Sequence, residues 1–166
     1  MKLIVHDLTA QQESELGLRG PDVHIVADDG TIHPCIGCFG CWVKTPGQCV
    51  IRDSYGDMGA LLGHCDEYIV ISRCCYGGFS SFVKNVMDRS ISYMHPDFRI
   101  RGGEMHHRHR YDNRLVYRVF FYGDDLSDEE KATAEALVRA NVLNFDGTLA
   151  TLRFADRLEE FAGGVV

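Results

Sequence analysis

Several features that define other classes of protein are missing from this chain of 166 residues. No apolar run approaches the roughly 20 residues that cross a bilayer, so we expect no membrane association. Lysine and arginine total 17 against 24 aspartates and glutamates, a net charge of −7. That balance argues against nucleic acid as a partner, because binding it requires cations that neutralise phosphates. No internal repeat, Ser-His-Asp arrangement or paired carboxylates stand out, so a hydrolase has no support.

The first residues do not have the pattern of a secretory leader. The segment MKLIVHDLTAQQ has one lysine and a short apolar run, and then turns polar without a small-residue cleavage site. We therefore expect a cytoplasmic protein. In a reducing compartment, clustered cysteines usually indicate metal or redox chemistry rather than structural disulfides.

Short apolar runs alternate with segments of helical character. The runs predict strands at Lys2–His6, Asp22–Ala27, Glu67–Ser72, Leu115–Tyr122 and Thr148–Phe154. Helices are expected over residues 9–16, 58–64, 80–94 and 127–143, the last behind a Ser127–Glu130 capping box. Such alternation is typical of a parallel sheet with helices on both faces. We predict one domain over residues 1–166: an α/β, flavodoxin-like three-layer sandwich with a five-stranded parallel sheet of order 2-1-3-4-5.

Two segments show no regular pattern. His95–Arg114 is rich in histidine and arginine, and we expect a solvated excursion or part of a subunit contact. Its histidines lack the spacing of a helical zinc pair. If a nicotinamide dinucleotide binds, Arg108 and Arg110 are the first arginines to test. The tail Ala162–Val166 is expected to be loose.

Four of the seven cysteines lie close together, at Cys35, Cys38, Cys41 and Cys49. Three thiolates at steps of three in a glycine-containing loop can surround one centre, and the fourth can close it. This pattern favours a 4Fe-4S cluster. A structural zinc site more often pairs two separated Cys-x-x-Cys units. Zinc remains an alternative, and so does a tight loop of free thiols.

Two segments together resemble a known superfamily. They are PCIGCFGCWVKTPGQCVIRD and DEYIVISRCCYGGFSSFVKNVMDRS, and the resemblance extends over about residues 2–154. The chain is similar to the flavodoxin-like NADPH-dependent FMN reductase and iron–sulfur flavoprotein superfamily. The resemblance implies FMN as a cofactor, NAD(P)H or a protein as electron donor, and a homo-dimer or tetramer. It also implies a 4Fe-4S cluster on the four cysteines that passes electrons to FMN.

The same resemblance implies which residues contact the flavin. The loop after the third strand would wrap the isoalloxazine ring, and Thr9 and Gly123 would lie at neighbouring strand ends. The loop consists of Arg73, Cys74, Cys75, Tyr76, Gly77, Gly78, Phe79 and Ser80, and it precedes the matching helix positions Lys84, Asp88 and Arg89. Tyr76 and Phe79 would stack on the ring or would serve as loop anchors.

The chain departs from the superfamily at two places. The phosphate loop is normally rich in glycine and hydroxyl side chains at a helix N-terminus. Here it is replaced by residues 6–11, in which Asp7 would repel a phosphate and only Thr9 offers a hydroxyl. Cys74 stands where proline is usual. The Cys74–Cys75 pair is either redox-active beside the flavin or, as we favour, buried and inert.

These observations lead to three hypotheses. The first is an FMN-dependent oxidoreductase or electron-transfer flavoprotein, with or without an iron–sulfur cluster. The second is a flavodoxin-fold module without flavin, acting as a metal, thiol-redox or protein-binding scaffold. The third is a thiol redox sensor that uses the same cysteines.

Overall fold

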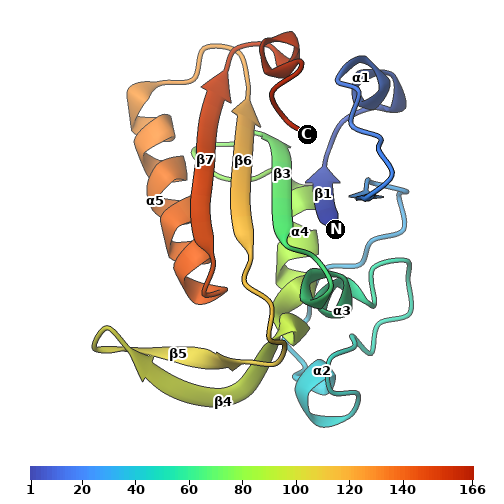
Figure 1. The fold of residues 1–166 in the computed structure, drawn as a ribbon, viewed down its shortest axis with the longest axis vertical. Coiled ribbons are helices and arrows are strands. Elements are labelled where there is room, and N and C mark those ends of the chain that lie inside the picture. Colours follow the sequence, from blue (N-terminus) through green and yellow to red (C-terminus); the bar gives the residue numbers. More distant parts are fainter.

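A five-stranded parallel sheet forms the centre of the computed structural model, which describes residues 1–166 (Figure 1). Its strands lie in the order β2-β1-β3-β6-β7, and every neighbouring pair is parallel. The bounds are β1 Lys2–His6, β2 Val23–Val26, β3 Glu67–Arg73, β6 Val116–Tyr122 and β7 Thr148–Ala155. Counted within the sheet, this is order 2-1-3-4-5, so the predicted fold class is confirmed.

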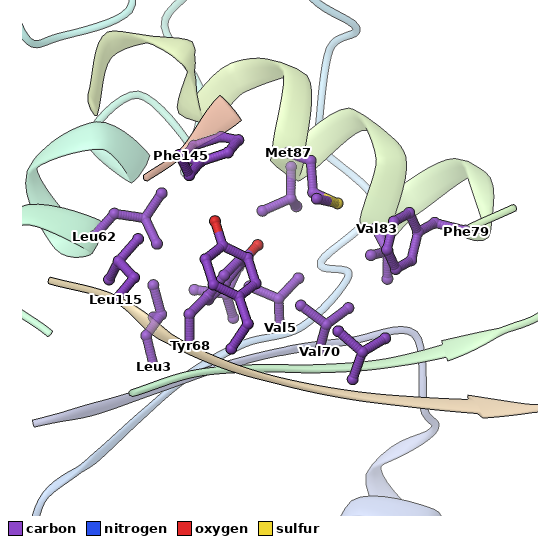
Figure 2. Close-up of a cluster of buried hydrophobic side chains, with 14 of the residues drawn as sticks. Leu3, Val5, Leu62, Tyr68, Val70, Phe79, Val83, Met87, Leu115 and Phe145 are labelled. Atoms are coloured by element: carbon purple, nitrogen blue, oxygen red, sulfur yellow. The ribbon is translucent and has the colours of Figure 1, made fainter. Parts of the chain in front are cut away.

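Side chains of the central strands alternate between two cores, as the period of a β-strand requires. In β1, Leu3 and Val5 join the larger core and Ile4 joins the smaller one. The larger core lies under α3 (Met58–Gly63), α4 (Ser81–Arg89) and α5 (Asp128–Asn144). Figure 2 shows Leu3, Val5 and Val70 on the sheet facing Val83 and Met87 of α4. This packing fixes α4 above the sheet.

The opposite face has a thinner cover, formed by α1 (Ala10–Glu15), the 3-10 helix η2 (Leu158–Phe161) and the C-terminal residues. Arg118 donates hydrogen bonds to the carbonyls of Gly164 (2.8 Å) and Val165 (2.7 Å). Val165 is 1% exposed. The expectation of a loose tail is therefore wrong, because a sheet arginine and the smaller core hold it.

Residues 94–109 form an antiparallel hairpin of β4 (Met94–Arg101) and β5 (Glu104–His109). No strand was predicted in this segment, because its sequence shows no clean period. Gly102 and Gly103 both have positive φ, +58° and +87°, which is the backbone that a tight two-residue turn between twisted strands needs. The hairpin lies at the amino-terminal end of the sheet strands, beside the short helix α2 (Gly40–Val43) (Figure 1).

Helix boundaries follow local capping chemistry. Ser127 and Glu130 form the predicted capping box at α5, and Thr9 and Gln12 form one at α1. The predicted helix over 80–94 ends earlier, because α4 stops at Arg89 and tightens into the 3-10 helix η1 (Ser90–Tyr93). No helix in the structure is both long enough and apolar enough to span a membrane.

Gly59 allows α3 to approach η1 closely, and we expect Gly59→Ala to destabilise the fold by about 1–3 kcal/mol through overpacking. An added Cβ would lie 2.7 Å from the backbone nitrogen of Tyr93, where the backbone cannot yield cheaply. Urea unfolding measures the change. Gly20→Ala is the control, because its Cβ would meet Val23 at an ordinary 3.4 Å. A Gly59→Ala protein as stable as the parent would contradict this packing.

Candidate functional site

A cavity of about 500 Å³ lies between α4, α5, the cysteine-bearing segment and the β4–β5 hairpin. Met87 from α4, Leu137 from α5 and Met105 from β5 contribute apolar walls, while Lys84 and His107 contribute polar groups. A mostly apolar hollow of this size with a few polar groups is typical of small-molecule sites. Its walls come from four separate segments between residues 35 and 145, and sequence reasoning did not find it.

All four predicted metal ligands line this cavity. Cys35 and Cys38 are exposed, whereas Cys41 and Cys49 are half-buried. Burial raises the pKa of the Cys41 thiol, and the neighbouring Cys49, Cys35 and Cys38 raise it further. The thiols therefore lie close enough to influence one another electrostatically. No three His, Cys, Asp or Glu side chains, however, are already arranged to hold a metal ion.

The donor set around this cavity suits a soft metal centre. It offers four thiols on one short loop, and the N–H of Gly40 lies 3.4 Å from Cys38 Sγ as a hydrogen-bond donor. Phe39, just before α2, has φ +57°, a strained conformation for an aromatic residue. To bind a cluster or zinc, the sulfur atoms would have to move closer together. A bound iron–sulfur cluster would supply one-electron transfer, whereas a bound zinc ion would stabilise the loop structure.

A buried ion pair holds the base of the cysteine loop. Arg89, at the end of α4, donates to both carboxylate oxygens of Asp53, at 2.7 and 2.8 Å. It also donates to the carbonyl of His33, at 2.8 Å. The two side chains are 0% and 2% exposed. The pair therefore ties both flanks of the cysteine segment to the helix that ends beneath it.

Aromatic rings form the wall between the cysteine loop and the hairpin. The ring centroid of Trp42 lies 4.8 Å from that of His107, which lies 4.7 Å from that of Phe98. Trp42 Nε1 also donates to the carbonyl of Met94, at 3.0 Å. The hairpin therefore packs on the cysteine loop. The Gly102–Gly103 pair between alternating residues was the sequence signal that could have found it.

The arginines of the hairpin mainly anchor it. Arg99 and Arg101 of the hairpin, with His109 and the later Arg114, contact Asp146 in the turn after α5. Burial and these arginines lower the pKa of His109 to about 4, so its ring is neutral at pH 7. Of the two arginines singled out for a nucleotide, Arg110 donates to the carbonyl of Ser92 (2.9 Å). Arg108 remains largely exposed (side chain 61%).

The predicted flavin loop, residues 73–80, follows β3 at the carboxyl end of the sheet. Cys75 and Gly78 exchange two backbone hydrogen bonds of 2.9 Å, which enclose a two-residue turn. Both turn residues have positive φ, +52° at Tyr76 and +75° at Gly77. Tyr76 is 94% exposed, so a bulky ring stands in solvent on a strained backbone. Strain of this kind is often found at binding sites.

The other members of this loop have different surroundings. Cys74 is buried and burial raises its pKa, as an inert thiol requires, whereas Cys75 is exposed. Phe79 is buried and packs on Phe121 at 4.9 Å between centroids, so it acts as a loop anchor. The Ser80 hydroxyl is buried without a hydrogen-bond partner. It precedes α4 and makes no capping bond.

The place expected for a phosphate is occupied by a carboxylate. Asp7 Oδ2 accepts the backbone N–H of Arg73 at 2.9 Å, and Oδ1 accepts the Tyr122 hydroxyl at 3.1 Å. Thr9, expected to bind the cofactor, is engaged in the capping box with Gln12. The N–H of Gly123, also expected there, donates to the Ala155 carbonyl at 3.2 Å. The Asp7 carboxylate, the engaged Thr9 hydroxyl and the engaged Gly123 N–H therefore offer a phosphate no free donor.

The two predicted sites lie at opposite ends of α4. The predicted flavin loop ends just before Ser81, and the Arg89–Asp53 ion pair lies at the other end of the helix. At the rise of an α-helix, the nine residues of α4 span about 14 Å. Phe79 is the member of the flavin loop that also lines the cavity. The cavity therefore begins beside the cysteines and reaches the base of the flavin loop.

Solved structures share this architecture at low sequence identity. A Trp repressor binding protein from Bacillus subtilis aligns with TM-score 0.59 and 12% identity, covering 100% of this chain and 99% of its own. The fold is flavodoxin-like. Azoreductase AzrA aligns with TM-score 0.54 and 8% identity (99% and 92% covered). An FMN-dependent NADH-azoreductase from Bacillus anthracis, solved with FMN, aligns with TM-score 0.51 and 10% identity (90% and 85% covered).

One curated protein is similar in sequence. The iron–sulfur flavoprotein MJ1083 of Methanocaldococcus jannaschii is 37% identical over 62 residues, which cover 37% of this chain and 31% of that protein. The match thus spans about a third of the relative's length. A scan against protein-family models finds no match. Over these 62 residues the chain is similar to an iron–sulfur flavoprotein, and the solved structures show that it has the flavodoxin-like fold.

Arg89→Met tests whether the buried pair holds the cysteine loop. It leaves the Asp53 carboxylate buried without a partner, so we expect a loss of about 3–5 kcal/mol in the free energy of unfolding, measured in urea. Arg139→Met is the control, because Arg139 forms an exposed pair with Glu135 on α5 and should contribute about 0.5 kcal/mol or less. Equal stability losses in the two variants would contradict a structural clamp.

Proposed function

We propose that this protein is a flavin-dependent oxidoreductase or electron-transfer protein that binds an isoalloxazine ring at the loop 73–80. The observation that carries the proposal is the exposed, strained Tyr76 turn at the carboxyl end of a flavodoxin-like sheet. Ligands of open α/β sheets bind outside these strand ends. The similarity to an iron–sulfur flavoprotein and the fold shared with an FMN-dependent azoreductase support it.

Each group in the loop has a distinct task in this proposal. Tyr76 offers a flat face for the ring. The Ser80 hydroxyl lacks a partner and would gain one from a polar atom at the ring edge. Gly77 lets the turn lie against α5, because an added Cβ would come within 2.6 Å of Thr133. The bound flavin would supply the one- or two-electron chemistry, and the protein would hold the flavin in position.

The cysteine loop is the second redox candidate. We propose a 4Fe-4S cluster on Cys35, Cys38, Cys41 and Cys49, with zinc as the competing metal. Because the pKa of Cys41 is raised, its thiol would have to lose a proton to become a ligand, and binding would strengthen as pH rises. The cluster would exchange electrons with a flavin at the far end of α4.

Reducing equivalents would come from NAD(P)H or a protein donor. Exposed apolar side chains surround the cysteine loop and the hairpin, which supports a protein contact at this end: an electron donor or a second copy in a homo-dimer or tetramer. They are Ile36, Phe39, Val43, Phe98, Ile100 and Met105.

A flavin-free scaffold is the second candidate, and Asp7 favours it. A module that had lost its cofactor would retain the fold and the cysteines, and the carboxylate would be free to occupy the old phosphate position. The two candidates differ in whether a flavin ring binds at all.

Lumiflavin, an isoalloxazine without a polar tail, tests the ring site independently of any phosphate. We expect saturable quenching of its fluorescence by the protein, and Tyr76→Ala should weaken binding about tenfold, the value of one aromatic stack. Phe98→Ala removes an exposed aromatic side chain at the other end and should leave the affinity unchanged. Absence of saturable binding to the parent protein would favour the scaffold.

Anaerobic reconstitution tests the cysteine site. With iron and sulfide we expect about four of each per chain, and Cys38→Ser should lower that content sharply. Cys75→Ser removes an exposed thiol outside the loop and should retain the full content. One zinc per chain that iron cannot replace would instead identify a structural zinc site.

A further inference from the structure

Asp7 joins three strand ends at the point where the strand order reverses. It belongs to the turn after β1, and its two oxygens accept hydrogen bonds from Arg73 at the end of β3 and Tyr122 at the end of β6. The crevice at such a reversal is where the anionic part of a nucleotide normally sits. In this chain the crevice already holds a negative charge.

The backbone donors that could bind an anion here are largely engaged. The N–H of Leu8 donates to His6 Nδ1 at 3.1 Å, and the N–H of Thr9 donates to Gln12 Oε1 at 2.9 Å. The N–H of Gln12 in turn donates to the Thr9 hydroxyl, at 3.3 Å. Helix α1 has six residues, so its dipole adds little. A phosphate would therefore find only the N–H groups of Ala10 and Gln11 without a partner, at a short helix that adds little positive field.

Further carboxylates lie along the same end of the sheet, after β6. Lys131, Arg73 and Arg157 are cations at this end of the sheet, and they are fewer than the five carboxylates. Glu130 is close enough to Cys74 to raise the pKa of its thiol. A dianion approaching the flavin loop would thus meet an unfavourable field from more than one side. The acidic residues of this stretch are Asp124, Asp125, Asp128, Glu129 and Glu130.

We propose that this end of the sheet selects a flavin with an uncharged, hydroxyl-bearing tail, of the riboflavin class, and rejects the 5′-phosphate of FMN through Asp7. This inference rests on the proposed flavin function and specifies its ligand. A carboxylate has about four lone-pair positions, and Asp7 uses two of them within the protein. The remaining positions can accept hydrogen bonds from tail hydroxyls, as acidic residues of dinucleotide-binding sheets accept them from ribose.

Competing equilibrium titrations with riboflavin and FMN test the proposal on the unmodified protein. Riboflavin should bind at least about tenfold more tightly, the effect expected of like charges near a partly solvated surface. The preference should shrink when salt is raised from about 0.02 to 0.5 M, because salt screens repulsion of FMN and leaves riboflavin unaffected. FMN binding as tightly as riboflavin at low salt would overturn the proposal.

Asp7→Asn assigns the effect to one residue. The amide oxygen can still accept the Arg73 N–H, while the charge is lost, so FMN affinity should rise about tenfold and riboflavin affinity should change less than about threefold. Asp124→Asn is the control, because it removes an exposed carboxylate at the same end of the sheet that does not join the strand ends as Asp7 does. It should change the FMN affinity less than Asp7→Asn does. Circular dichroism establishes that each variant folds.

The possible outcomes separate this inference from the function on which it rests. Lumiflavin and riboflavin binding without discrimination against FMN would overturn the inference and leave the flavin function standing. An unchanged preference in folded Asp7→Asn would overturn the role of Asp7. Failure of lumiflavin, riboflavin and FMN alike to bind would overturn both.

Discussion

The buried pair of Arg89 and Asp53 is the interaction on which the cysteine end of the molecule depends. Residues 27–57 connect β2 to α3 with only the short α2 between them, so no long helix fixes their path. The pair supplies that constraint, and its guanidinium holds the pKa of Asp53 well below the usual range. A depressed carboxyl pKa contributes stability above the unfolded-state value of about 3.9, and this contribution is lost as pH falls further. The Arg89–Asp53 ion pair therefore stabilises the folded protein at neutral pH.

The larger core gives α4 a second role as the link between the two candidate sites. Val83 and Val86 are fully buried against the sheet, and Lys84, Met87 and Asp88 on the adjoining side of the helix line the cavity. The predicted flavin loop leads into one end of α4, and the Arg89–Asp53 ion pair lies at the other end. The two candidate sites are thus mounted on one rigid element, as precise positioning would require. The strained turn at Tyr76 and the strained Phe39 lie at these two places.

Local patterns predicted the sheet well, because each buried strand is a short apolar run and each capping box is a local signal. The sequence-based predictions failed where contacts between residues far apart in the sequence determine the structure. The tail was expected to be loose, yet Arg118 and the smaller core hold it. The hairpin was missed although Gly102–Gly103 marked its turn, because histidine and arginine obscured the alternation. The exposure of Cys75 beside the buried Cys74 depends on the turn geometry, which composition does not reveal.

The central claim is that this flavodoxin-like protein carries a flavin whose tail lacks a phosphate. The most direct measurement is the UV-visible spectrum of the anaerobically purified protein, before and after incubation with riboflavin, with identification of any extracted flavin. We predict flavin absorption bands that are present from the start or appear on incubation, and an extracted flavin without the 5′-phosphate. A protein that shows no flavin bands under either condition would contradict the account.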